Sequence, residues 1–527
     1  MAHKSVMVHQ FSLAPKADIP RSYYDRSHGY KTTFDAGYLV PIFVDEVLPG
    51  DTMNMKASMF ARMATPIYPI MDNMFLDTFW FFVPNRLIWE NFQKFMGERE
   101  NPGDSTDFLC PQVNAPSGGW QSQSLSDYFG LPTGVENIKA DSFLHRAYNL
   151  IWNEWFRDEN LQNSVEVPKG DGPDADQLFQ LLRRGKRHDY FTSALPWPQK
   201  GPGVEIPIGT TADVVSNGNA LQFSRLSTTA YPAGSFAVNS GSTDTVDWYS
   251  SAGTHDDTTN RALKYESGLE VDLSSATAVT INSLRQAFQM QKMLERDALS
   301  GSRYIEILKG HFGVTSPDAR LQRPEYLGGS SSRILINPVA QTSSTDDTSP
   351  QGNLSAYGVV ADTVHGFTKS FVEHGVLIGL ANVRADLTYQ QGINRMFSRQ
   401  TREDFYWPVF AHLGEQAILN KEIYAQGTDQ DDEVFGYQER FAEYRYKPSL
   451  VTGKFRSQDP QSLDAWHLAQ DFAELPKLNA EFIEDNPPID RVVAVPSEPH
   501  FLFDAFFDYK CVRCMPVRSV PGLVDHF

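Results

Sequence analysis

Cysteine is scarce in this chain of 527 residues, which contains only Cys110, Cys511 and Cys514. Three cysteines are too few for a disulfide framework and fit a protein made in a reducing compartment, with the cytoplasm as the default. Cys511 and Cys514 form a C-x-x-C pair, which could be a redox pair or half a zinc site. The pair lies in a β-like run with one other thiol in the chain, so we predict no metal and no cofactor.

Long hydrophobic runs are also missing. The most apolar segments, such as Phe75 to Val83, have roughly half the ~20 residues that a helix needs to span a bilayer. The segment from Met1 to Phe11 is interrupted by polar residues where a secretory signal would be apolar. We therefore expect a soluble protein without membrane insertion.

Positive charge is in deficit, because 46 Lys and Arg face 65 Asp and Glu for a formal net charge of −19. Phosphate binding needs clustered basic residues, so any DNA contact must be local. The densest basic run is RRGKRH, and its candidate contact residues are Arg183, Arg184, Lys186 and Arg187. They could bind DNA phosphate or form a salt-bridged surface between subunits. Aromatic residues follow this run and do not alternate with it, so base stacking is poorly supported.

Catalytic signatures are absent too: we find no nucleophile elbow, phosphate loop, dinucleotide fingerprint or H-E-x-x-H motif. The acidic cluster from Asp429 to Glu433 lacks the glycine of an EF-hand and reads as a solvated turn. We predict no catalytic residue and no enzyme. The alternative is a secreted or cellular β-sandwich that binds carbohydrate or cleaves glycosides, since the chain has 9 Trp and 21 Tyr. A non-viral shell protein is a second alternative.

What the sequence does contain are short β-branched and aromatic runs separated by turns, among 36 Gly and 32 Pro. Strands near both ends of the chain must meet in one sheet system, which predicts a mainly β protein with a double-sheet jelly roll. Pro41 cannot donate to a ladder, so its strand should be an edge or carry a bulge. The predicted strands cover Tyr38 to Val47, Met53 to Arg62, Met74 to Val83, Arg333 to Ile336, Gly375 to Ala381 and Phe501 to Val512.

Two helices are expected between these strands. One follows Ser142 as its N-cap, and the other begins at Ser283, where Ser283 and Gln286 match a capping box, and ends at Gly301. Between them, the segment from about Thr210 to Thr280 is rich in Ser, Thr, Gly and acidic residues and reads as an exposed insertion. Within it, Asn217-Gly218 is a hairpin signal between two short apolar runs.

The predicted organisation has four parts. They are an extended N-terminal arm (1–35), the first part of the jelly roll with a helical insertion (36–209), the exposed insertion loop (210–280), and the remainder of the jelly roll with the C-terminal strand (281–527).

Several sequence blocks, in the same order, resemble the major capsid proteins of the Microviridae, in particular the gokushovirus branch. The resemblance extends over nearly the whole chain. The blocks are FDAGYLVP from Phe34, YNLIWNEWFRD from Tyr148, HDYFTSALPWPQKGPGVEIPIG from His188, GSRY from Gly301, HFGV from His311 and DARLQRPEYLGG from Asp318.

The resemblance implies an eight-stranded antiparallel jelly roll of the viral capsid type with long helical and loop insertions, self-assembling as sixty copies into a T=1 icosahedral capsid. That shell would enclose circular single-stranded DNA in the virion of a bacteriophage and assemble in the cytoplasm of the host bacterium. Expected partners are a small basic DNA-packaging protein and a minor spike or pilot protein.

The insertion would form a protrusion at the three-fold axes and could serve in attachment to a host surface receptor, where repeated weak contacts add up. Its candidate attachment residues are Asn217, Gly218, Trp248, Tyr249, Asp256 and Asp257.

Overall fold

The computed structural model divides the chain into two compact units, one formed by 1–198 with 300–527 and the other by 199–299. It describes residues 19–204, 213–216, 222–225, 236–240, 246–250, 263–267, 269–272, 281–300, 304–314, 321–347 and 349–518.

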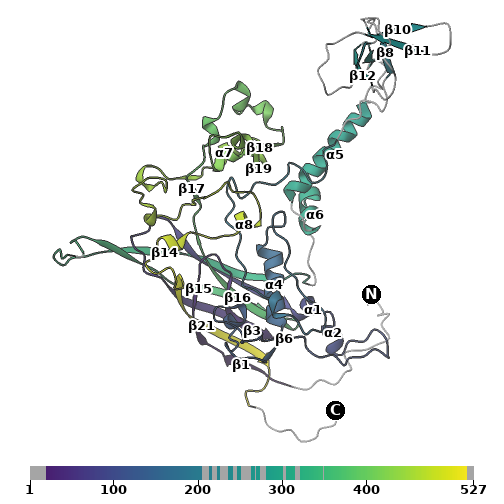
Figure 1. Cartoon of the computed structure of the whole chain (residues 1–527). Coiled ribbons are helices and arrows are strands. Elements are labelled where there is room, and N and C mark those ends of the chain that lie inside the picture. Colours follow the sequence, from purple (N-terminus) through teal and green to yellow (C-terminus); the bar gives the residue numbers. More distant parts are fainter. Residues whose placement is uncertain are drawn as a thin grey trace. The chain divides into compact units, whose positions relative to one another are not determined.

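The first unit is built on two four-stranded antiparallel sheets (Figure 1). The first has the order β2-β21-β4-β15, the second β14-β5-β16-β3, and pairing of β14 with β15 joins them. A further strand, β1, extends β2 along the same partner, so the two share one edge position. This arrangement confirms the predicted eight-stranded jelly roll. The strands are β1 (Arg21–Asp25), β2 (His28–Phe34), β3 (Val40–Val47), β4 (Thr52–Met63), β5 (Met74–Pro84), β14 (Glu325–Ala340), β15 (Leu354–Ser370), β16 (Gly375–Ala385) and β21 (Phe501–Cys514).

Two local predictions can be compared with this topology. The strand with Pro41, β3, lies at the end of the sheet order and has a register shift opposite Leu380, so it is both an edge and irregular, as expected. In the predicted arm 1–35, the stretch 21–34 forms β1 and β2 of the sheet, while 1–18 lies outside the described residues.

The main core lies between the two sheets. In β4 buried and exposed residues alternate, as expected of a strand with one face in the core, and Met55 and Met59 point inward while Lys56 and Phe60 are exposed. The close packing leaves no room for a side chain at Gly379, where a Cβ atom would lie 2.4 Å from the ring of Trp80.

The central strands of the second sheet, β5 and β16, are buried on both faces. In β5, Trp80 and Phe82 belong to the core between the sheets, whereas Phe81 and Val83 belong to a second cluster on the outer face. That cluster is completed by the insertion between β5 and β14, which explains why nearly every residue of β5 is apolar. The elements of the insertion that form this cover are α1 (Asn85–Ile88), α2 (Phe92–Phe95), β6 (Gln112–Asn114), α3 (Leu125–Tyr128), β7 (Lys139–Asp141) and α4 (Phe143–Ile151).

Helix α4 confirms the predicted helix, and Ser142 occupies its N-cap position as predicted. The Ser142 side chain makes no capping hydrogen bond and is fully buried. At its other end the helix continues as a π-helical turn, Trp152–Phe156.

The segment between β16 and β21 is mostly turns and short 3-10 helices around a third cluster. Its regular elements are β17 (Thr388–Tyr389), β18 (Glu415–Leu419), α7 (Asn420–Ile423), β19 (Val434–Glu439), β20 (Ser449–Leu450) and α8 (Ala480–Ile483).

The described residues of the second unit form three antiparallel strand pairs and a long helix. The hairpin predicted at Asn217-Gly218 is wrong, because the strands on either side of it pair with later strands, β8 with β13 and β9 with β12. The helix confirms the second predicted helix, but it begins at Ile281, so Ser283 lies inside it and does not cap it. The elements are β8 (Asp213–Ser216), β9 (Gln222–Arg225), β10 (Phe236–Ser240), β11 (Val246–Ser250), β12 (Leu263–Ser267), β13 (Leu269–Asp272) and α5 (Ile281–Ser300).

A buried histidine makes the fold sensitive to acid. His145 on α4 contacts Ser126 Oγ at 2.9 Å, and burial lowers its pKa from 6.5 to about 4. The unfolded chain therefore binds the proton more tightly, and stability falls as the pH drops from 6.5 towards 4, by about 3 kcal/mol from this residue.

We expect H145Q to lose less stability than the wild type over that pH range in urea unfolding, because Gln does not titrate. The exposed His412 provides the control H412Q, which should follow the wild type. Parallel pH curves for H145Q and the wild type would contradict this assignment.

Candidate functional site

The basic run lies against the start of β3 and the end of α8. The amide of Arg184 donates to the Gly37 carbonyl at 2.9 Å, and the amide of Lys186 donates to the Ile483 carbonyl at 2.7 Å. These bonds fix the run as a strand-like bridge within the first unit.

Arg183 and Arg184 are held by groups of their own chain. The Arg183 guanidinium lies 4.0 Å from the centre of the Tyr38 ring, and Arg184 donates to the Asp77 carboxylate at 2.5 Å. Arg384 donates to the same carboxylate at 2.7 Å. Burial alone would raise the pKa of Asp77, but hydrogen bonds from Ser331 and the two arginines hold it below its ordinary value. Both arginines also interact electrostatically with the buried Asp485, so this part of the wall holds two basic and two acidic groups.

Lys186 is buried, whereas Arg187 is not. The Lys186 ammonium donates to the Phe482 carbonyl at 2.6 Å, and burial lowers its pKa to about 8. Burial also raises the pKa of the nearby Asp485 to about 7. The side chain of Arg187 is 66% exposed, and its nearest carboxylate, Asp386, is 3.7 Å away. Arg187 is thus the most accessible of the four predicted contact residues.

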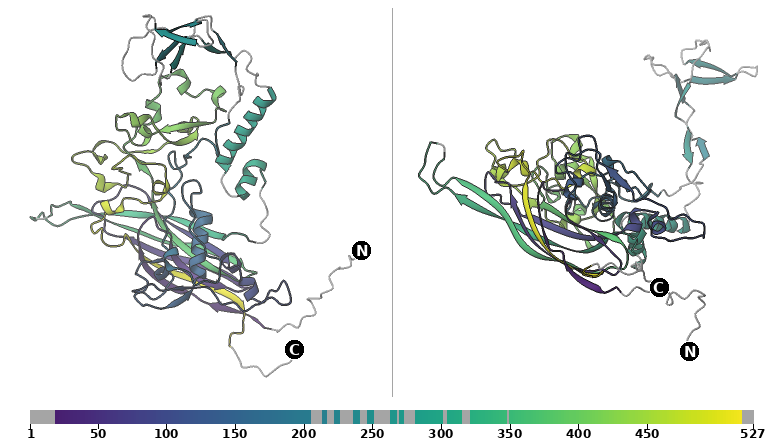
Figure 2. Two further views of the ribbon diagram at one scale, coloured as in Figure 1. Left: turned by 45° about the vertical axis from the view of Figure 1, so that its right-hand side comes forward. Right: turned by 90° about the horizontal axis from the view of Figure 1, so that it is seen from below.

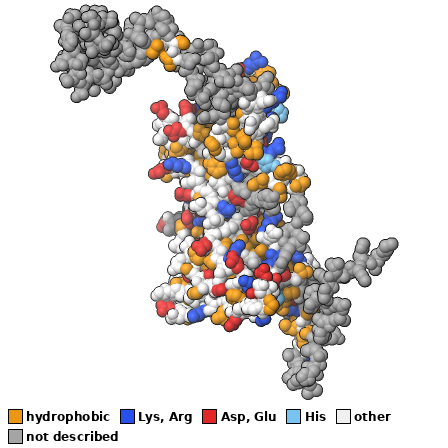
Figure 3. All heavy atoms as spheres, turned by 90° about the vertical axis from the view of Figure 1, so that its right-hand side faces the viewer, with side chains coloured by type: hydrophobic (Ala, Val, Ile, Leu, Met, Phe, Trp, Pro, Cys, Tyr) orange, Lys and Arg blue, Asp and Glu red, His pale blue; other side chains and the backbone are white. Residues whose placement is uncertain are grey.

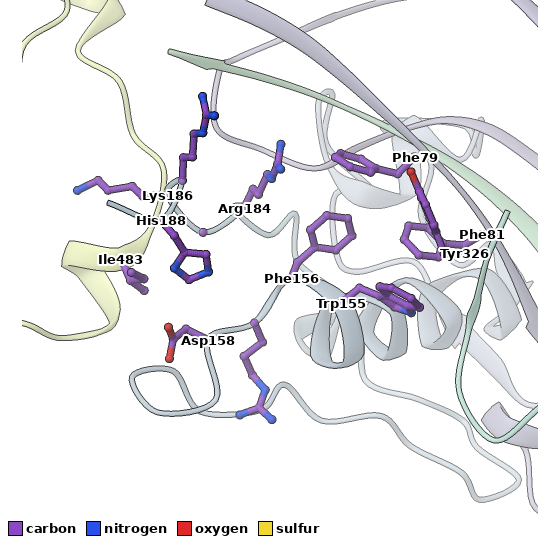
Figure 4. A pocket seen from close by; sticks show the side chains of 13 residues that line it. Phe79, Phe81, Trp155, Phe156, Asp158, Arg184, Lys186, His188, Tyr326 and Ile483 are labelled. Atoms are coloured by element: carbon purple, nitrogen blue, oxygen red, sulfur yellow. The ribbon is translucent and has the colours of Figure 1, made fainter. Parts of the chain in front are cut away.

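The run forms one wall of a pocket of about 390 Å³ (Figure 4). Figure 4 shows aromatic rings on one side of this pocket and His188 with Asp158 on the other, with Phe156 between them. The aromatic lining residues are Phe79, Phe81, Trp155, Phe156 and Tyr326, and the basic ones are Arg157, Arg184, Lys186, Arg187 and His188.

The rings converge because three separate elements deliver them. Phe79 and Phe81 come from β5, Tyr326 from β14, and the π-helical turn after α4 supplies Trp155 and Phe156.

Two rings of the pocket are fixed in place and still accessible. The indole N–H of Trp155 donates to the Pro324 carbonyl at 3.0 Å, and its ring centre lies 5.7 Å from that of Tyr326. Trp155 is 38% exposed and Tyr326 42% exposed. We call the whole pocket, with its aromatic and basic lining residues, the aromatic-basic pocket.

Sequence reasoning placed the basic wall but missed the aromatic one. Aromatic residues were expected next to the basic run, whereas the rings lie 28 positions (Phe156) to 142 positions (Tyr326) from Arg184 along the chain. The WNEWF sequence at the end of α4 was the available signal, since Trp152, Trp155 and Phe156 at i, i+3 and i+4 gather three rings on one helix face.

A second surface feature is the hairpin of β14 and β15, which extends beyond the sheets in both views of Figure 2. Its outer part pairs Leu335–Ala340 with Leu354–Val359. The register places Leu335, Val339 and Tyr357 on one face, and these side chains are 58%, 47% and 42% exposed. Figure 3 shows another face of the molecule, where hydrophobic side chains also reach the surface beside Lys and Arg.

The predicted attachment residues fall in the second unit. Trp248 and Tyr249 lie in β11, opposite Val238 and Ala237 of β10. Asn217, Gly218, Asp256 and Asp257 lie outside the described residues.

Other sequence candidates show no metal chemistry. Among the described residues, no group of three or more His, Cys, Asp or Glu side chains could hold a metal ion. Cys511 is buried in β21 and Cys514 is exposed at its end, and both are free thiols. In the acidic cluster, Asp431 accepts the amides of Gln426 and Gly427, which closes the turn. No helix in the described part of the chain is long and apolar enough to cross a membrane.

The fold and these surfaces define a class of protein. Eight-stranded double-sheet jelly rolls are the architecture of viral capsid and lectin domains. A projecting hairpin with an exposed apolar face suits a subunit of a shell better than a monomeric lectin.

Comparison with known proteins gives the family. The family described as capsid protein (F protein) matches residues 12–523. The chain is 51% identical to capsid protein VP1 of Bdellovibrio phage phiMH2K and 48% identical to capsid protein VP1 of Chlamydia phage 1, over 98% of each chain. It is 37% identical to capsid protein VP1 of Spiroplasma virus 4 over 99% of each chain.

The chain belongs to the F-protein family of capsid proteins, from Microviridae phages with single-stranded DNA. It is a structural component of the virion capsid and not an enzyme, which rules out the glycoside-cleaving alternative.

The contacts of the basic run separate structural from accessible arginines. R184Q leaves the buried Asp77 with fewer charged donors and should lower the free energy of unfolding by roughly 1.5–3 kcal/mol. R187Q removes an exposed charge and should change it by less than about 0.5 kcal/mol. Urea unfolding of both variants measures the difference, and equal losses would contradict these roles.

Proposed function

We propose that the chain assembles as sixty copies into a T=1 icosahedral shell around circular single-stranded DNA. The observation that supports this most directly is the match to capsid proteins over nearly the full length of the chain. A closed shell also needs contacts between unlike surfaces whose rotations close.

The hairpin of β14 and β15 is the proposed contact to a second copy. A two-stranded ribbon is marginally stable in water, and apolar residues that gather on one exposed face mark interaction sites. Leu335, Val339 and Tyr357 form such a face. A neighbouring copy that covers this face would stabilise the hairpin and join the two subunits.

This contact can be tested with the variant L335T/V339T/Y357T. Threonine retains the strand preference but removes most of the apolar surface. We expect the variant to fold, by circular dichroism, but to sediment as small species where the wild type forms shells. N337T, on the same face between these residues, is the matched control and should assemble. Wild-type shell yield from the triple variant would contradict the proposal.

We further propose that the second unit attaches the particle to a host surface receptor. Its acidic, polar composition suits an exposed segment, and many copies on one shell would strengthen weak single contacts. The strands β10 and β11, which carry Trp248 and Tyr249, are the candidate contact region.

The pairing of β8 with β13 offers a clean deletion. Asp213 and Asp272 are register partners, so a short Gly-Ser turn can replace residues 214–271 without separating the chain ends. We expect particles of this variant to assemble and retain nuclease-protected DNA but to lose adsorption to host cells. A second variant, W248A/Y249A, keeps the unit but changes the candidate contact residues, and it should also reduce adsorption. Normal adsorption by the deletion particles would refute the attachment role.

The negative charge of the chain supports a further partner. With a net charge of −19 the coat cannot neutralise a genome by itself, and its DNA contacts must be local. A small basic DNA-packaging protein is the proposed source of the missing positive charge. A minor spike or pilot protein is a further proposed partner, suggested by the family resemblance alone.

A further inference from the structure

We propose that the aromatic-basic pocket binds one unpaired base of single-stranded DNA together with an adjoining phosphate. The proposal rests on the proposed enclosure of single-stranded DNA and names a binding site for it. It assigns the ring stack to Trp155 and Tyr326 and the phosphate contact to Arg187.

The aromatic wall has the properties that base binding requires. Bases stack on aromatic side chains in proteins that bind single strands, and every base offers a flat face. Trp155 and Tyr326 present partly exposed rings 5.7 Å apart, and a hydrogen bond to the Pro324 carbonyl fixes the indole. The π-helical turn that positions Trp155 and Phe156 forms the C-terminal end of the helix that begins with α4.

The basic wall has an excess of positive charge in an acidic chain. Arg184 and Arg384 share the carboxylate of Asp77, and the exposed Arg187 forms a salt bridge with Asp386 at 3.7 Å. Asp158 is the one acidic residue in the lining, and its carboxylate accepts the amides of Asn160 and Leu161. An anion at this wall would compete with Asp386 for the exposed guanidinium of Arg187, because exposed ion pairs are weak.

The size and shape favour a single strand over a duplex. A volume of about 390 Å³ is in the range of pockets that hold small ligands and can hold a base with its sugar. A paired base inside a duplex cannot enter a pocket lined by rings, because its faces are covered by its neighbours. Sequence specificity is not expected, because stacking tolerates every base.

The test measures binding of a fluorescein-labelled oligo-dT to the full-length, unassembled chain by fluorescence anisotropy. W155L should raise Kd roughly tenfold, as expected for the loss of one base stack, while W155F should restore most of the affinity. R187Q should lower the slope of log K against log salt concentration by about 0.7, the value for one phosphate contact on a single strand.

The chain offers a matched control in Trp407. It is 39% exposed and carries Arg402 over its ring at 4.6 Å, as Trp155 is 38% exposed and carries Arg323 at 4.9 Å. W407L should leave Kd within twofold of the wild type. Circular dichroism of each variant checks that the fold is retained.

Particles give a second readout. Ultraviolet irradiation of purified wild-type particles should cross-link DNA to peptides that contain Trp155 or Tyr326, as found by mass spectrometry. Cross-links at other residues only would overturn the proposal.

Two further results would overturn it. Equal Kd values for W155L, W407L and the wild type would show that the pocket does not bind the strand. A W155L variant that binds oligo-dT normally but fails to form shells would assign the pocket to a segment of a neighbouring copy. In either case, wild-type particles that retain nuclease-protected DNA would leave the proposed shell function intact.

Discussion

The structure depends on the burial of β5 and β16, the central strands of the β14-β5-β16-β3 sheet, on both of their faces. Trp80 and Phe82 pack towards the other sheet, and Phe81 and Val83 pack towards the insertion helices. An apolar strand of this kind cannot stand at the surface, so the long insertion after β5 must cover it. The other sheet keeps one face exposed, as the alternation in β4 shows. The chain therefore has a covered side that carries insertions and an open side that is a bare sheet.

The same constraint creates the aromatic-basic pocket. The cover over β5 ends where α4 turns into a π-helix, and Phe79 and Phe81 extend from beneath it towards Trp155 and Phe156. Arg184 reaches this edge because its partner Asp77 lies on the same strand as these phenylalanines. The pocket thus lies at the edge of the area of β5 that the insertion covers. Its rings contribute to folding as well as to the proposed binding of a base.

Much of the fold could be predicted from the sequence, because alternation and apolar runs are local signals. The strands from Tyr38 to Val83 and the strand from Phe501 follow the predicted runs closely. Pairing in the second unit was beyond such signals, since Asn217-Gly218 is a hairpin motif but Val214 and Val215 pair with β13 instead. The cap at Ser283 failed for a related reason, because the helix begins two residues earlier. The basic run was found, yet its partners Asp77, Tyr38 and Phe482 come from distant segments that only tertiary structure brings together.

Electron cryomicroscopy of purified particles tests the central claim, a shell made of copies of this jelly roll, most directly. The account predicts uniform shells of sixty copies in which the β14 and β15 hairpin of each copy lies on a neighbour, with Leu335, Val339 and Tyr357 covered. A stable monomer, or shells in which this hairpin face remains in solvent, would contradict it.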